Sequence, residues 1–311
     1  MTVSPPLVTV GIPVYNGAST LAEALRSVAG QTYRNLEILI ADNGSVDATQ
    51  AICAQFTAGD ARARYVRHET NRGAVWNFNH VMRTATGRYF MWAAHDDLLH
   101  PQFIEKACDV LEARQDVVLC HSETQPVVDV GQPVGAAYIG WANDAESARE
   151  RWRMVLRRSE LHAAIYGLMR RDAAQRTRGL LACVQADWIF MIEMSVLGSI
   201  AQIPETLQYK RVPAVATDYH SREEMLRYMG APSAGLGAQL RPPRANVMAQ
   251  AVRSLPLIGV GRRDRVRLLT DAVRIYSSEG GLTFDARDIV STLMTRRARS
   301  RARSTPDKLR P

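Results

Sequence analysis

Apolar and polar positions follow two alternating periods through the first third of the chain, and this pattern predicts strands that alternate with helices. Short, mostly apolar runs, typical of buried strands, occupy residues 7–12, 36–41, 64–67 and 88–94. Helical spacing of apolar residues follows each run and predicts amphipathic helices beginning near residues 20, 47, 76 and 101.

The expected boundaries of these elements rest on a few polar residues and prolines. The first strand is expected to stop at Pro13. Thr20 and Glu23 have the spacing of a capping box, and Asp47 suits a helix N-cap. Pro101 suits a first helical turn, where no backbone donor is needed.

Strands and helices that alternate in this way predict an α/β fold with a mostly parallel central sheet covered on both faces. Ligands of such sheets bind at the carboxyl ends of the strands. Five polar residues fall at those ends: Asn16, Asp42, Asn43, Asp96 and Asp97. The sequence therefore predicts a binding site along this edge.

The alternation weakens beyond residue 125. Residues 125–140, with several Gly and Pro, are expected to form an irregular excursion. Helical periodicity returns at residues 145–158, 186–197 and 262–277, and residues 213–243 are expected to be loop-like around a short helix.

Composition places the chain among globular proteins. Its 311 residues are 46% hydrophobic and 23% charged, enough to bury a full core. The formal net charge of +8 is concentrated in part at the end of the chain, where Arg296, Arg297, Arg299, Arg301 and Arg303 crowd together. We expect this segment to be a disordered basic tail.

Cysteine usage and hydropathy suggest a location. Cys53, Cys108, Cys120 and Cys183 lie far apart without metal-ligand spacing, so reduced thiols, mostly in the core, are expected. Neither a secretory signal nor an apolar run of about 18 residues, the usual minimum for a membrane span, is visible. The expected location is the cytoplasm.

The pair Asp96-Asp97 carries the clearest chemistry. Two acidic side chains follow His95 at a strand end, where one carboxylate can hold a divalent cation and the other can reach a nucleotide ribose or sugar. Mg²⁺ and Mn²⁺ favour such oxygen ligands and take others from substrate phosphates. An isolated acidic pair is more often a solvated turn or a helix cap.

The wider sequence resembles family 2 of the inverting glycosyltransferases, which have the GT-A fold, over roughly residues 7–210. The order and spacing of several motifs carry the resemblance: Val10-Gly11-Ile12-Pro13-Val14-Tyr15-Asn16, Ser27-Val28-Ala29-Gly30-Gln31-Thr32-Tyr33, residues 37–47 with Asp42-Asn43-Gly44-Ser45, Asn71-Arg72-Gly73, and Gly87-Arg88-Tyr89-Phe90 through His95-Asp96-Asp97. Residues 165–171 also resemble the segment that links the two halves of that family's domain.

The resemblance implies roles for individual residues. Asp97 would hold Mn²⁺ or Mg²⁺, and Asp96 would orient the donor. The nucleotide base would be lined by the first strand end and the second strand end, and Arg72 would lie near the base or diphosphate. These donor-binding residues are Pro13, Tyr15, Asn16, Asp42, Asn43, Arg72 and Asp96. Many members carry two acids where this chain has Asp42-Asn43, so the base that is recognised stays open.

The second half would supply the remaining chemistry. Asp187 resembles the family's later acidic residue and would deprotonate the acceptor as general base, although an Asp at a helix start is also a common cap. Glu193 is expected to be structural. Pro213 stands where many relatives have a histidine after a basic stretch, and His220 is a candidate substitute as metal or phosphate ligand, or a plain loop histidine.

The resemblance also implies an organisation and a reaction. Residues 1–125 would bind the nucleotide-sugar donor and 126–212 the acceptor, followed by a helical extension at 213–295 and the tail at 296–311. The enzyme would move a sugar from a UDP-, TDP- or GDP-sugar to a hydroxyl of a glycan, glycolipid or metabolite. The tail suggests weak contact with the inner membrane face rather than nucleic-acid binding.

Three alternatives compete with this hypothesis. A dinucleotide-binding fold needs a G-x-G-x-x-G turn that residues 11–17 lack. A nucleotidyltransferase needs a glycine- and lysine- or arginine-rich phosphate loop after the first strand, and none is present. A basic binding protein with a degenerate donor site would act through its tail.

Overall fold

The computed structural model describes residues 4–129, 132–138, 140, 142–157, 164–212, 222–230, 242–278, 281, 283 and 285–287. His220 and the basic tail from Arg296 lie outside these residues, as does the loop expected at residues 213–221 and 231–241. Statements on them stay predictions.

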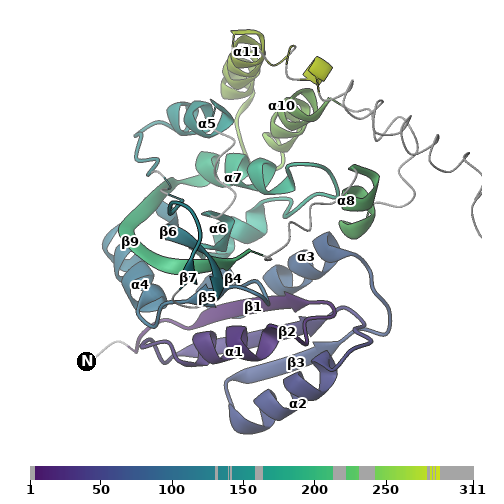
Figure 1. Cartoon of the computed structure of the whole chain (residues 1–311). Helices are drawn as coiled ribbons and strands as arrows, with labels where there is room; N and C mark the ends of the chain where they lie inside the picture. Colours follow the sequence, from purple (N-terminus) through teal and green to yellow (C-terminus); the bar gives the residue numbers. More distant parts are fainter. Residues whose placement is uncertain are drawn as a thin grey trace, which may run out of the picture.

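The described residues form an α/β fold (Figure 1). Its strands are β1 (Val8–Val14), β2 (Leu36–Asp42), β3 (Ala63–Arg67), β4 (Tyr89–Trp92), β5 (Leu98–Leu99), β6 (Val117–Asp129), β7 (Gln132–Pro133), β8 (Leu168–Arg170) and β9 (Ser199–Arg211). Its helices are α1 (Leu21–Ala29), α2 (Thr49–Gly59), α3 (Ala74–Thr84), α4 (Phe103–Ala113), α5 (Ala148–Arg157), α6 (Arg171–Arg176), α7 (Ala186–Leu197), α8 (Arg222–Tyr228), α10 (Pro243–Ser254) and α11 (Arg262–Ser278). A 3₁₀ turn spans Ala164–Tyr166.

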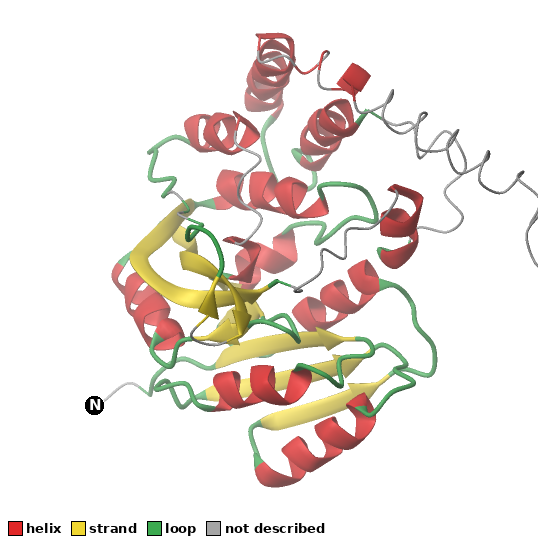
Figure 2. Ribbon diagram, in the orientation of Figure 1, coloured by secondary structure: helices red, strands yellow, loops and turns green. Residues whose placement is uncertain are grey.

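The strands join into one curled sheet of mostly parallel strands, in the order β3-β2-β1-β4-β8-β6-β9-β5, with β7 paired to β6 (Figure 2). The pairs β1–β2, β2–β3, β1–β4 and β6–β9 are parallel, whereas β8 runs antiparallel between β4 and β6. Parallel β1, β2 and β4 bring their carboxyl ends to one edge, so the predicted fold class is confirmed.

Apolar side chains pack on both faces of the sheet. One cluster joins α1, α2 and α4 to the sheet, with Leu25, Cys53 and Phe103 among its fully buried members. The other joins α3, α5, α7, α10 and α11, and it contains Trp152 and Trp188. The four cysteines are free, and three of them are buried, as the sequence predicted.

Pro13 does not end the first strand, which continues to Val14. The carbonyl of Gly11 accepts the Ala93 amide on the β4 side. Backbone groups of every second residue in a strand point to the same side, so the nitrogen of Pro13 also faces β4. The pairing with β4 has ended at Gly11 with Trp92, so the missing amide hydrogen of Pro13 costs no ladder bond.

The predicted helices are confirmed, but their starts differ in chemistry. Thr20 is the N-cap of α1 without making a side-chain cap bond, so the expected capping box is wrong. Glu23 pairs instead with Arg211. Asp47 lies one residue before the N-cap of α2, where its Oδ1 accepts the Thr49 amide at 3.0 Å.

Two other predictions of local structure are wrong. Pro101 lies in the turn before α4, whose N-cap is Gln102. Residues 125–129 are the second part of β6 and not an irregular excursion, because β9 pairs with this segment up to Val127 and Arg211. Among the described residues, no helix is both long and apolar enough to cross a membrane.

Candidate active site

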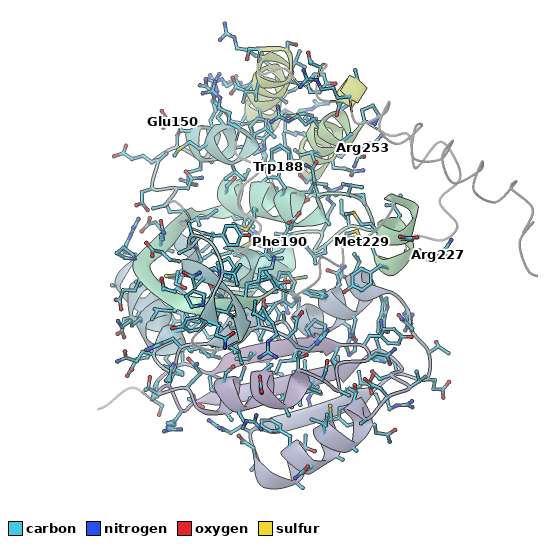
Figure 3. All side chains as sticks on the ribbon, in the orientation of Figure 1. Glu150, Trp188, Phe190, Arg227, Met229 and Arg253 are labelled. Atoms are coloured by element: carbon cyan, nitrogen blue, oxygen red, sulfur yellow. The ribbon has the colours of Figure 1, made fainter. Side chains whose placement is uncertain are left out.

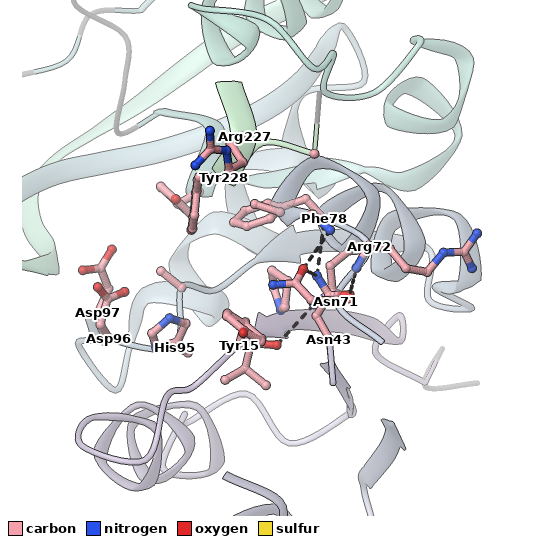
Figure 4. Close-up of a pocket in the computed structure, with 18 of the residues that line it drawn as sticks. Tyr15, Asn43, Asn71, Arg72, Phe78, His95, Asp96, Asp97, Arg227 and Tyr228 are labelled. Atoms are coloured by element: carbon pink, nitrogen blue, oxygen red, sulfur yellow. Dashed lines mark hydrogen bonds between the residues drawn. The ribbon is translucent and has the colours of Figure 1, made fainter. Parts of the chain in front are cut away.

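A cavity of about 860 Å³ opens at the carboxyl ends of β1, β2 and β4. The end of β9 and helix α8 complete its wall. Figure 4 shows Asp96 and Asp97 at one end of it and Asn43 and Asn71 at the other. Aromatic rings lie between the two ends, contributed by Tyr15, Phe78 and Tyr228.

The acidic end is built by the segment that follows β4. Oδ1 of Asp97 accepts the backbone amide of Arg211 at 3.0 Å, which ties the acid to the end of β9. Burial, and then the neighbouring charge of Asp96, raise the pKa of Asp97 to about 7. The cationic side chains of Lys210 and Arg211 act in the opposite direction but do not offset this cost.

This end of the cavity fits a divalent cation that is shared with a substrate. Two adjacent carboxylates face the cavity, and the raised pKa shows that positive charge would relieve an unfavourable site. No group of three or more His, Cys, Asp or Glu side chains within the described ranges could hold a metal alone. Mg²⁺ and Mn²⁺ commonly need only one or two carboxylates when phosphates and water supply the other ligands.

Tyr166 lies beside the acids on the 3₁₀ turn that precedes β8. Burial raises the pKa of its phenol well above the ordinary value, and the charges of Asp97 and Asp96 add to the effect. The hydroxyl is therefore protonated at neutral pH and can donate a hydrogen bond into the cavity.

A network of amides shapes the other end. Nδ2 of Asn43 donates to Oδ1 of Asn71 at 2.8 Å and to the carbonyl of Gly73 at 3.1 Å. Oδ1 of Asn43 accepts the amide of Arg72 at 3.0 Å, and Oδ1 of Asn71 accepts the amide of Gly73 at 2.8 Å. These bonds fix which atom of each side-chain amide is oxygen, and they leave Nδ2 of Asn71 without a partner among the described residues.

Asn77, on α3, lines the same end and is 2% exposed. Its Nδ2 donates to the carbonyl of Ala41 at 2.7 Å, which ties the side chain to the end of β2. Its Oδ1 is buried and accepts no hydrogen bond from the residues that the structure describes. Its backbone amide donates to Gly73, so Asn77 and the network around Asn71 meet at one residue.

The strand-end residues predicted from sequence do not all face the cavity. Pro13, Tyr15, Asn43, Arg72, Asp96 and Asp97 line it. Asp42 and Asn16 do not.

The side chains of Asp42 and Asn16 are engaged with the protein itself. The carboxylate of Asp42 is fully buried, accepts hydrogen bonds from Tyr65 and from the Ser45 amide at 2.8 Å each, and lies 3.6 Å from Arg67. The exposed Asn16 has a φ of 52°, and its Oδ1 accepts the Val46 amide at 3.0 Å. Both side chains therefore support the loop that follows β2, at Ser45 and Val46.

Arg72 lies at the amide end of the cavity, far from the acids (Figure 4). Its guanidinium carbon is 3.9 Å from the centre of the Trp76 ring, which also stacks on His80. This contact holds the guanidinium against Trp76, away from Asp96 and Asp97.

Helix α8 closes the cavity opposite β1 through Arg227 and Tyr228. Gly230, just after α8, packs against Gly73, where an added Cβ would meet the Gly230 Cα at 2.3 Å. Gly73 also has a φ of +88°, so glycine is required there for two reasons.

Asp187 is the second residue of α7, close enough for its charge to affect the phenol of Tyr166, but it does not line the cavity. Its Oδ1 accepts the amide of Trp188 at 2.8 Å. The N-cap of α7 is Gln185, so Asp187 is not the helix cap, and its role as general base stays a prediction. Glu193, one and a half turns later, is fully buried and paired with Arg178 at 2.7 Å, which accords with the structural role expected from sequence.

The sequence did not single out several cavity residues as site residues, among them Asn71, Asn77, Phe78, Tyr166, Glu224, Arg227 and Tyr228. Asn77 sits inside an amphipathic helix, where a single polar residue is not a signal. Tyr166 lies within the segment 165–171 that resembles the family, and this was the only available hint.

Comparison with known proteins places the chain in context. The model of the family described as glycosyl transferase family 2 matches residues 9–176, more than half of the chain. An uncharacterized glycosyltransferase of Rickettsia typhi is 36% identical over 116 residues, which cover 37% of this chain and 35% of the relative. The chain spans about a third or less of the length of the first curated relatives that it matches.

Solved structures share the fold. TarS of S. aureus, in complex with UDP-GlcNAc, aligns with a TM-score of 0.61 at 15% identity and covers 87% of this chain and 72% of that one. The mannosyltransferase PcManGT from Pyrobaculum calidifontis, in complex with GDP-Man and Mn²⁺, aligns with a TM-score of 0.52 at 17% identity over 99% of this chain and 91% of that one.

Proposed function

Because the chain belongs to glycosyl transferase family 2, we propose that it transfers a sugar from a nucleoside diphosphate donor to a hydroxyl group of an acceptor. The observation that carries this proposal is the cavity, with a carboxylate pair at one end and a fixed amide network at the other. A nucleoside diphosphate matches both ends. Its phosphates can share a cation with the carboxylates, and its base can form hydrogen bonds with the amides.

The donor is proposed to lie along the cavity with its diphosphate at Asp96 and Asp97. Asp97 would hold a Mg²⁺ or Mn²⁺ ion, and Asp96 would orient the ribose or sugar. When bound, the cation would neutralise charge on the diphosphate as it leaves. Lys210 at the same end adds positive charge, and Tyr15 offers a ring against which ribose or base can pack.

The amide end favours one kind of nucleobase edge. Nδ2 of the exposed Asn71 can only donate. Uracil, thymine and guanine present a carbonyl oxygen next to a ring N–H, and this oxygen can accept a hydrogen bond from the Asn71 amide. Adenine and cytosine present an amino group next to an unprotonated ring nitrogen, the reverse pattern. We therefore propose a UDP-, TDP- or GDP-sugar as donor.

Transfer with inversion is proposed to proceed by a single displacement. The acceptor oxygen would form a bond to the anomeric carbon while the bond from that carbon to the diphosphate oxygen breaks. Asp187 would take the proton of the acceptor hydroxyl as general base. Its place near Tyr166, which borders the acidic end, supports this role. The acceptor is proposed to be a glycan, a glycolipid or a metabolite.

A thermal-shift panel tests the donor site. UDP, TDP, GDP, ADP and CDP are compared with Mn²⁺ and with EDTA, since a ligand that binds the native state raises the melting temperature. We expect stabilisation by at least one of the first three that needs the metal, and weaker stabilisation by ADP and CDP. Asp97→Asn should fold and lose the metal-dependent shift. Stabilisation by none of the five, in folded protein, would contradict the donor site.

The base edge has its own test in the same assay. Asn71→Asp replaces the donating amide by an acceptor of the same size, and should weaken the preferred diphosphate by about tenfold or more. Asn35→Asp, at an exposed position far from the cavity, is the matched control. An unchanged nucleotide preference in Asn71→Asp would show that the base does not contact this amide.

A further inference from the structure

Helix α11 carries an exposed apolar stripe that the donor site does not use. Val266, Leu269 and Val273 are 64%, 46% and 58% exposed. Their spacing of three and seven residues places them on one face of the helix. Another face, with Leu268, Ala272 and Ile275, is buried in the core. The exposed stripe is therefore a second apolar surface and not part of the packing of α11 on the domain.

Arginines border this stripe on the side that faces α5. Asp271 of α11 pairs with Arg149 of α5 at 2.6 Å, which fixes the two helices side by side. In the helical projection of α11, Arg263, Arg267 and Arg274 share one face. This face lies between the apolar stripe and Asp271.

Helix α5 continues the basic surface. Arg153 is close enough to affect the carboxylate of Asp271. Arg153 and Arg157 are one turn apart and border a hollow of about 360 Å³ together with Glu150 and Met154. The hollow is large enough for a phosphate-bearing headgroup.

The acids near this surface are few. Asp264 lies 3.4 Å from Arg267, and Glu150 is bonded to Ser147. With the Arg149–Asp271 pair included, six arginines, at positions 149, 153, 157, 263, 267 and 274, face three acids, Glu150, Asp264 and Asp271. Charge complementarity points to an anionic partner, and the apolar stripe between the charges points to one with an apolar interior.

We propose that α11 and α5 form a docking surface for an anionic lipid bilayer, with Val266, Leu269 and Val273 inserted at the headgroup boundary. A helix with an apolar stripe bordered by arginines lies in the plane of such an interface. Nucleic acids and other soluble polyanions would use the arginines but would leave the stripe in water. Figures 1 and 3 show α11 and α5 at the end of the molecule opposite β3 and α2, with their side chains projecting outward.

Flotation of the full-length protein with vesicles tests the proposal. Vesicles of phosphatidylcholine alone are compared with vesicles containing 30 mol% phosphatidylglycerol. We expect binding to the anionic vesicles only, weakened by salt. Absence of binding to anionic vesicles at low salt, or equal binding to both kinds, would overturn the proposal.

Two variants assign the binding to this surface. Val266→Ser/Leu269→Ser/Val273→Ser removes the stripe, and Arg153→Gln/Arg263→Gln/Arg274→Gln removes charge, with a loss of about fivefold expected for each arginine. Both should fold, because the changed side chains are exposed apart from the half-buried Arg153, and circular dichroism checks this. Matched controls carry Val46→Ser/Val134→Ser or Arg34→Gln/Arg83→Gln/Arg88→Gln, on exposed positions elsewhere.

The results for the two variants distinguish a bilayer from other binding partners of this surface. Loss of vesicle binding in both variants, with the controls unchanged, supports the bilayer. Wild-type binding in both would mean that the Arg-rich tail binds alone, and the proposal would fail. Loss only in the arginine variant, with heparin binding lost in parallel, would indicate a polyanion. A wild-type dimer that becomes monomeric in the stripe variant would indicate a second copy of the chain.

Discussion

Replacing Asp97 by Asn should stabilise the metal-free protein at alkaline pH. The substitution keeps the size of the side chain and an Oδ1 that can accept the Arg211 amide. It removes a partly buried negative charge next to that of Asp96. Sites built for a ligand commonly carry such an unfavourable arrangement in the free protein.

The magnitude follows from the pKa of this carboxyl. Its value of about 7 in the folded protein compares with 3.8 ordinarily, a difference of at most about 4 kcal/mol at about 1.4 kcal/mol per pH unit. Partial exposure to solvent reduces the expected gain to about 1–3 kcal/mol.

The raised pKa of Asp97 determines how the stability difference between variant and wild type changes with pH. Below about pH 4 the carboxyl is protonated in both the folded and the unfolded state, so the variant gains nothing. Between about pH 4 and 7 only the unfolded chain has lost the proton, and the wild type loses stability as the pH rises. Above pH 7 the difference is constant.

Urea unfolding in EDTA at pH 5 and pH 8 measures this difference. Asp109→Asn, an exposed acid on α4, is the control for the loss of one negative charge. Addition of Mn²⁺ and the preferred nucleoside diphosphate should then stabilise the wild type and not the variant. A variant that is no more stable than the wild type at pH 8, or whose advantage does not grow between pH 5 and 8, would refute the reasoning.

Three further predictions concern the scaffold around the cavity. Arg178→Met leaves the fully buried Glu193 without its partner and should lower the free energy of unfolding in urea by about 3–5 kcal/mol, most of which Arg178→Met/Glu193→Met should restore. Gly73→Ala should lower the melting temperature and weaken nucleotide binding, because its Cβ would push the end of α8 outward; equal nucleotide affinity in calorimetry would contradict this. Burial lowers the pKa of His68 and of His80, so stability is full above pH 6.5 and falls as the pH drops below it. Gln at both positions should flatten the fall between pH 6.5 and 5 in melting curves, and an unaltered slope would count against it.

The sequence predicted the sheet edge that carries the site because strands and helices have different apolar periods. Helix α7 was placed at its observed bounds, and the predicted acids of the β4 end line the cavity, while their roles stay predictions. Prediction failed where a distant partner decides the structure. Residues 125–129 extend β6 because β9 lies beside them, and no local pattern shows this.

Neighbouring residues at a strand end are hard to assign for a geometrical reason. Asp42 and Asn43 are adjacent, but successive side chains point in opposite directions at the end of β2. Only Asn43 faces the cavity, while Asp42 binds Tyr65 and Ser45 in the interior. The motif predicts polar residues at this strand end, and the packing of β3 determines which of the two lines the cavity.

A crystal structure with Mn²⁺ and the nucleoside diphosphate that stabilises the protein most would test the central claim most directly. The anomalous signal of manganese locates the ion independently of the nucleotide. We predict the ion within about 2.0–2.3 Å of a carboxylate oxygen of Asp97 and of a phosphate oxygen, with the base against Asn71. An ion bound elsewhere, or a nucleotide with its base at the acidic end, would contradict the account.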